Sequence, residues 1–136
     1  MKNFLFLALL SLSSNSFAHD FSSQLGDPKS CEANDISCTD YIYISCDNLT
    51  DKVHIEISGN KSAGSPIISA QIFKDTKAKN ITSQGNNIVD FQGGGGAYQM
   101  TINKNKIGMV NYTLVYHCED ANGEHTETDL NELQNQ

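Results

Sequence analysis

The sequence predicts an all-β protein, either an antiparallel sandwich or a partly closed barrel, with about six to eight short strands. Apolar and polar residues alternate with period two in several segments, which places successive side chains on opposite faces of a strand. Turn-forming residues separate these segments at short intervals. No segment has a convincing helical period. These three observations together favour short strands joined by turns over a mixed α/β domain.

The expected strands follow one another without an internal repeat. In residues 40–46 the alternation places Ile42, Ile44 and Cys46 on one face. Residues 53–57 alternate most cleanly: the aliphatic side chains point inward, and His54 and Glu56 point outward. We interpret His54 as a solvated side chain. The other expected strands are residues 66–73, 87–91, 97–102 and 110–118.

Four consecutive glycines, residues 93–96, precede the expected strand 97–102. A phosphate-binding loop would need Lys and Ser or Thr after its last glycine, followed by a helix, and neither is present here. The glycines therefore predict a turn that tolerates positive φ. The chain also has no His-Glu-x-x-His motif, and no cysteine is left over as a nucleophile if all four are paired. We expect no catalytic residues and no enzymatic activity.

Residues 1–18 have the features of a secretory signal peptide. Lys2 supplies the positive start, residues 4–12 form a nearly continuous apolar run, and Ser16 and Ala18 are small residues at −3 and −1. Cleavage is expected after Ala18, with a periplasmic or secreted destination. The run is shorter than the ~20 residues that span a bilayer, so no membrane span is expected.

Three segments are expected to follow the signal peptide. Residues 19–39 form a polar N-terminal segment, residues 40–118 the β-sandwich domain, and residues 119–136 an acidic C-terminal tail. Removing Lys2 with the signal peptide takes the formal charge from −7 to −8, and all nine basic residues are lysines. This balance argues against nucleic-acid binding, which needs clustered positive charge.

The four cysteines all lie after the signal peptide, and an even number in an exported protein predicts two disulfides. Their spacing lacks the Cys-x-x-Cys pairs of zinc sites. By strand parity Cys46 and Cys118 both point inward, which favours a Cys46–Cys118 bond and a small Cys31–Cys38 loop. The alternative, Cys38–Cys118 with Cys31–Cys46, is also compatible with antiparallel first and last strands.

The order of motifs "DYIYISC", "KVHIEISG", "GGGGAYQMTINK" and "VNYTLVYHC" resembles the bacterial pre-peptidase C-terminal (PPC) domain, over residues 40–118. The resemblance implies a jelly-roll-like β-sandwich that acts as an accessory or binding module of exported enzymes. We expect no catalytic domain beside it in this chain. The expected partner is a protein or glycan of the envelope or extracellular space. Some related modules bind calcium through acids before the first strand, where Asp27, Glu32, Asp35 and Asp40 lie.

Two sets of residues are predicted to bind a partner or a metal. Tyr41 and Tyr43 are candidate contact residues if their face is open, the alternative being that the second sheet packs on them. After cleavage, the amino group and ring of His19 could chelate copper together with His117 or His125, an arrangement that resembles the histidine brace of exported copper proteins. The segment 117–125 could curl back on itself. This metal-binding role is the alternative to a binding module without a cofactor.

Overall fold

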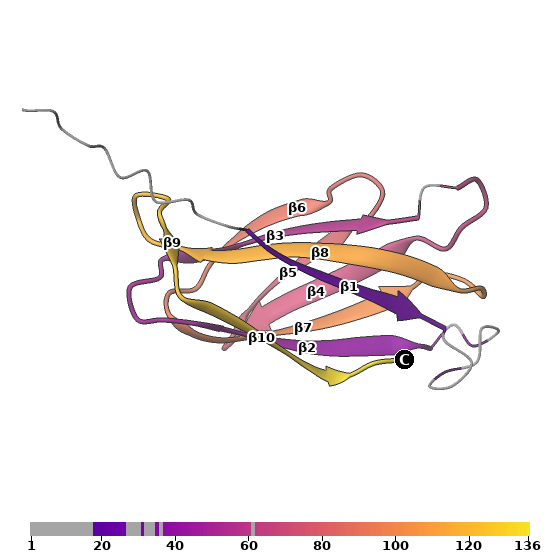
Figure 1. The fold of residues 1–136 in the computed structure, drawn as a ribbon, viewed down its shortest axis with the longest axis horizontal. Coiled ribbons are helices and arrows are strands. Elements are labelled where there is room, and N and C mark those ends of the chain that lie inside the picture. The colour runs from indigo at the N-terminus through magenta and orange to yellow at the C-terminus, as the bar shows by residue number, and fades with distance from the viewer. Residues whose placement is uncertain (1–17, 27–30, 32–34, 36, 61) are drawn as a thin grey trace, which may run out of the picture.

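The computed structural model describes residues 18–26, 31, 35, 37–60 and 62–136, which form two antiparallel sheets packed face to face (Figure 1). Sheet A has the order β1–β8–β3–β6, with the short β9 beside β8, and sheet B has the order β10–β2–β7–β4–β5. The strands are β1 (His19–Leu25), β2 (Thr39–Cys46), β3 (Lys52–Gly59), β4 (Ile68–Lys74), β5 (Lys77–Thr82), β6 (Ile88–Gln92), β7 (Gly96–Lys104), β8 (Val110–Glu119), β9 (His125–Thr126) and β10 (Thr128–Gln134). The predicted all-β sandwich is confirmed.

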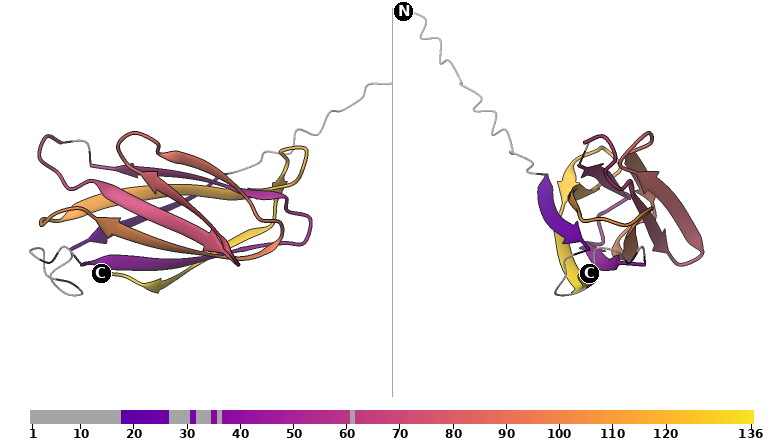
Figure 2. Two further views of the ribbon diagram at one scale, coloured as in Figure 1. Left: turned by 180° about the vertical axis from the view of Figure 1, so that it is seen from behind. Right: turned by 90° about the vertical axis from the view of Figure 1, so that its right-hand side faces the viewer.

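The core lies between the two sheets and follows the predicted alternation. On β3 the inward side chains of Val53, Ile55 and Ile57 are fully buried, as are Tyr98 and Met100 on β7. Figure 2 shows the strands enclosing this core in the end-on view. Burying large apolar side chains from both sheets supplies most of the stabilisation that a sandwich of this size has.

The sandwich extends beyond the expected domain of residues 40–118 at both ends. β1 lies in the segment 19–39 and pairs with β8, and β10 lies in the segment 119–136 and pairs with β2. Both are edge strands and half exposed, so their sequences do not show a full apolar alternation. Backbone hydrogen bonds to a neighbouring strand hold them instead. The acidic C-terminal segment is therefore structured as part of sheet B, where a tail was expected.

Both disulfides have the pairing that strand parity favours. Cys46 at the end of β2 is bonded to Cys118 on β8, which joins sheet B to sheet A through the core. The Cα atoms of this pair are 5.8 Å apart, and those of Cys31 and Cys38 are 5.9 Å apart. No free cysteine occurs in the part of the chain that is described.

The two disulfides are typical of an oxidising, exported environment. The predicted signal peptide falls almost wholly in residues 1–17, which lie outside the described residues. Within residues 18–136, apart from the gaps given above, no helix is long and apolar enough to cross a membrane.

The glycine turn before β7 surrounds a lysine. The Lys74 ammonium donates hydrogen bonds to the carbonyl oxygens of Gly93 (2.8 Å), Gly94 (3.1 Å) and Gly95, and it lies 4.6 Å from the centre of the Tyr98 ring. A phosphate loop presents backbone N–H groups to an anion. This turn presents carbonyl groups to a cation, which agrees with the prediction that it binds no phosphate.

A buried carboxyl group links the two sheets between β2 and β8, the strands next to the edge strands β10 and β1. Asp40 on β2 is fully buried, accepts a hydrogen bond of 2.5 Å from the Tyr112 hydroxyl on β8 and another of 2.7 Å from the backbone N–H of Gln136. Burial raises the pKa of Asp40 above its ordinary value, although these hydrogen bonds act in the opposite direction. Asp40 therefore has a structural role, with its oxygens already bound by protein donors.

Replacing Asp40 by Asn is expected to change how stability depends on pH. Because the folded-state pKa of Asp40 is raised, the folded protein binds this proton more tightly, and stability is lost as pH rises from about 4 through the raised pKa. Asp40→Asn removes that loss. In urea unfolding, the free energy of unfolding of the variant, relative to that of the wild type, should therefore be higher at pH 7 than at pH 4. A stability difference that is equal at both pH values would contradict the raised pKa.

Candidate functional site

The outer face of sheet B carries no charged side chain on β2, β7, β4 or β5, all of whose residues are described. We call the outward residues of these four strands the amide face. It combines amide, hydroxyl and aromatic side chains with two alanines. Its members are Thr39, Tyr41, Tyr43, Ser45, Ser69, Gln71, Phe73, Ala78, Asn80, Thr82, Ala97, Gln99, Thr101 and Asn103.

Tyr41 and Tyr43 point outward on the amide face, so the second sheet does not pack on them. Both are partly exposed, and in register they lie beside Thr101 and Gln99 of β7. Phe73, on β4, flanks Gln99 from the other side. The three rings are therefore spaced across the sheet among hydrogen-bonding side chains.

The polar groups of the amide face border a shallow groove over β7, β4 and β5. The groove has a volume of about 340 Å³, and Gln71, Asn80 and Thr101 lie in one row across it. Gln71 donates to the Asn80 side-chain oxygen at 3.0 Å, which leaves the amide N–H₂ of Asn80 and the oxygen of Gln71 for a ligand. The remaining donors and acceptors thus point to a ligand rich in hydroxyl groups.

The outer face of sheet A differs, because histidines and charged residues occupy it. His54 on β3 lies opposite His117 on β8, and their rings stack with centres 4.7 Å apart. His125 on β9 stacks on the His117 ring at 4.1 Å. Asp90 and Glu119 flank the three rings. We call these five residues the histidine cluster.

His54 and His117 each have a carboxylate partner. His54 Nδ1 is 2.6 Å from Asp90 Oδ1, and His117 Nε2 is 2.7 Å from Glu119 Oε1. The other Glu119 oxygen binds the Lys52 ammonium at 2.8 Å. Nδ1 of His117 is buried and has no hydrogen-bond partner. A buried nitrogen without a partner is uncommon, because its desolvation is not compensated.

The electrostatics of the cluster favour a neutral His117. Burial lowers the pKa of His117; its hydrogen bond to Glu119 opposes the shift, and nearby His125 and His54 reinforce it. For Glu119, burial acts to raise the pKa, but hydrogen bonds from Lys52 and His117 outweigh it and the pKa is lowered. At neutral pH the site therefore holds a neutral imidazole beside an ionised carboxylate.

The structure brings together two of the three histidines predicted to bind copper. His117 and His125 are in contact, whereas the His19 ring stacks on Tyr116, an inward residue of β8, at 5.6 Å. Adjacent residues of a strand face opposite sides, so the rings of His19 and His117 lie on different faces of sheet A.

The acids suggested for calcium do not form a site that can be described. Asp27 and Glu32 lie outside the described residues, and Asp40 is buried with protein donors. Asp35 accepts the backbone N–H of Ser37 at 2.7 Å. Among the described residues, the group with at least three metal-ligating side chains close together is His54, His117 and Glu119.

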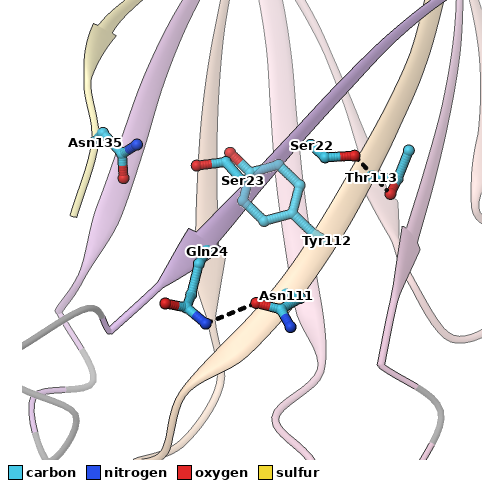
Figure 3. Close-up of a pocket in the computed structure, with 7 residues that line it drawn as sticks. All are labelled: Ser22, Ser23, Gln24, Asn111, Tyr112, Thr113 and Asn135. Carbon is cyan, nitrogen blue, oxygen red and sulfur yellow. Dashed lines mark hydrogen bonds between the residues drawn. The ribbon is translucent and has the colours of Figure 1, made fainter.

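A third polar surface lies where β1 meets β8, near the end of β10 (Figure 3). This open hollow has a volume of about 510 Å³. Its polar groups are largely paired with one another: Gln24 donates to Asn111 at 2.7 Å, and the Ser22 and Thr113 hydroxyls are 3.1 Å apart. It has no charged lining residue, and few of its donors and acceptors are left for a ligand.

Sequence reasoning identified the two tyrosines of sheet B but missed most of the histidine cluster on sheet A. His54 was interpreted as solvated, and Glu119 was assigned to the acidic tail. Finding them required the register of β3 against β8, which no local pattern provides. Three of the four strands of the amide face were expected, and every second residue of these three is uncharged, so this part of the face could have been found. The fourth, β5, was not expected as a strand.

The fold and these surfaces define a disulfide-bonded β-sandwich of an exported type, with an uncharged outer face on four strands of sheet B and a histidine-rich face on sheet A. In comparisons of the chain with protein-family models, curated proteins and solved structures, nothing matches.

Proposed function

We propose that this protein is an exported, non-catalytic module that binds a neutral glycan on the amide face. The observation that carries the proposal is the absence of charge from this face in a protein whose formal charge is −7. The role is of the accessory kind that the PPC resemblance implies. The periplasm or the extracellular space would supply the ligand.

The chemistry of the amide face suits a sugar chain. Sugar rings present C–H groups on one side, which pack on aromatic rings such as Tyr41, Tyr43 and Phe73. Their hydroxyl groups both donate and accept hydrogen bonds, as do the side chains of Gln71, Asn80 and Gln99. Four strands spaced at ~4.8 Å give a strip about 14 Å wide, which accommodates a short oligosaccharide.

A protein partner fits the face less well. Protein interfaces have an apolar centre and are enriched in aromatic residues, Met and Arg. On the amide face, Phe73 and the two alanines are its only fully apolar side chains among the described residues of its strands, and it has neither Arg nor Met. The lack of charge also argues against an acidic or basic polysaccharide, which would require charged partners.

Binding is tested by affinity electrophoresis in gels that contain neutral or acidic polysaccharides, with a glycan array to identify the sugar. The wild type should be retarded by at least one neutral polysaccharide. Tyr41→Ala/Tyr43→Ala should weaken the interaction at least tenfold, since losing ~1.4 kcal/mol of contact has that effect. Gln71→Ala/Asn80→Ala, at exposed positions, should weaken it without altering the aromatic rings.

The matched control is Ser22→Ala/Gln24→Ala in the hollow beside β1, which should keep full binding. Loss of binding in this control, with retention in both amide-face variants, would place the ligand elsewhere. Retardation only by acidic polysaccharides, or no retardation together with capture of a protein partner through Tyr41 and Tyr43, would overturn the glycan proposal.

A further inference from the structure

The histidine cluster lies on the opposite sheet from the amide face and is not used by the proposed glycan function. Its residues come from four neighbouring strands: Asp90 from β6, His54 from β3, His117 and Glu119 from β8, and His125 from β9. One nitrogen of each of His54 and His117 and one oxygen of Glu119 lie within 4.8 Å of one another. We propose that these three side chains bind a divalent transition-metal ion of the zinc or copper class.

The donor set determines the class of metal. Two imidazole nitrogens with one carboxylate oxygen suit zinc and copper(II), whereas calcium and magnesium prefer oxygen ligands alone. Bonds of about 2.1 Å in a tetrahedral site place ligand atoms about 3.4 Å apart, so the most widely separated pair needs to close by up to about 1.4 Å. Rotation of the partly exposed His54 side chain can supply this movement.

The surroundings hold the ligands as metal sites usually do. Asp90 binds His54 Nδ1, so His54 offers Nε2 to a metal, and a carboxylate behind a ligating histidine fixes its orientation. His117 Nε2 and Glu119 Oε1, which a shared metal ion would join, are already only 2.7 Å apart. His125 packs on the His117 ring and limits the movement of that ring.

The backbone beneath the site is rigid. Cys118 lies between His117 and Glu119 on β8 and is bonded to Cys46 of the other sheet. The directly opposed pairs His54–His117 and Lys52–Glu119 set β3 and β8 in register. A site on paired strands fixed by a disulfide is better organised for binding than one on loops.

The test is calorimetric titration of the untagged, disulfide-bonded protein, treated with chelator, with zinc chloride and separately with copper(II) chloride. We expect one ion bound per protein. His54→Ala should weaken binding at least tenfold, and His117→Gln should do the same. Because His117 is the more buried residue, circular dichroism checks each fold, and His54→Ala decides the outcome if His117→Gln does not fold.

His19→Ala is the matched control, because its ring lies on the other face of sheet A. It should bind the ion as the wild type does. Loss of binding in His19→Ala with retention in His54→Ala would overturn the proposal in favour of an N-terminal site. Absence of heat with both ions would also overturn it and leave the cluster as an ion-pair network. Glycan binding by the same samples is measured without metal, so that the glycan proposal can fail or hold independently of the metal proposal.

Discussion

Removing the Cys46–Cys118 disulfide is expected to lower the free energy of unfolding by about 4 kcal/mol. The bond closes a loop with a sequence separation of 72 residues, so the reduced unfolded chain gains a large number of conformations. Typical domains are stable by only about 5–15 kcal/mol, so the loss is a large fraction of the total. Urea unfolding of Cys46→Ala/Cys118→Ala against the wild type measures it.

The matched control is Cys31→Ala/Cys38→Ala, which opens a loop with a separation of only seven residues. Loop-closure entropy gives this bond about 2.5 kcal/mol, less than the other. Cys38 comes directly before β2, whereas Cys46 and Cys118 join the two sheets. An equal or larger loss in the control would show that strain or packing, and not the length of the closed loop, determines the stability of this sandwich.

Gly95→Ala is expected to destabilise the protein by more than about 3 kcal/mol, the range that backbone clashes and overpacking reach. A Cβ atom at Gly95 would overlap the carbonyl oxygen of Asp47 and lie 2.8 Å from the Cα of Asn48. Both are backbone atoms of the turn between β2 and β3, so no side-chain rotation relieves the contact. The backbone displacement needed to relieve this overlap would also move the Gly95 carbonyl away from Lys74.

Gly64→Ala is the control that separates sterics from backbone conformation. Gly64 has a φ of +87° with no atom within 4 Å of an added Cβ, so its substitution should cost only about 1–2 kcal/mol from the left-handed conformation. Gly95 is not in that region, and its cost is steric. Thermal and urea unfolding of the two variants should therefore differ clearly. A Gly95→Ala protein as stable as Gly64→Ala would mean that the turn can move.

Much of the fold could be predicted because a buried strand has an apolar alternation that is visible in its own sequence. The alternation at Val53–Ile57 and at Tyr98–Ile102 assigned the inward side chains correctly, and the same parity identified the Cys46–Cys118 pair. The edge strands β1, β5 and β10 were missed for the converse reason. Their pairing depends on backbone groups that every residue has, so "HDFSSQL" and "TDLNELQ" carry no strong pattern.

The two surfaces differed in how far sequence could define them. Tyr41 and Tyr43 were placed on one face by parity alone, and only the position of the second sheet had to be learned from the structure. The histidine cluster depends on which strands are neighbours: His54 and His117 are 63 positions apart in sequence. His19 is close to His117 along the sheet, because β1 lies beside β8, but its ring lies on the opposite face of sheet A from the histidine cluster.

The long disulfide also affects how the protein responds to proteases. Residues 62–64, between β3 and β4, are exposed, and exposed loop tips are the preferred sites of nicking. A cut there falls between Cys46 and Cys118, so the two fragments stay covalently joined. They also remain paired through the β3–β8 and β2–β7 ladders. The nicked molecule is therefore a two-chain sandwich that separates on a gel only after reduction.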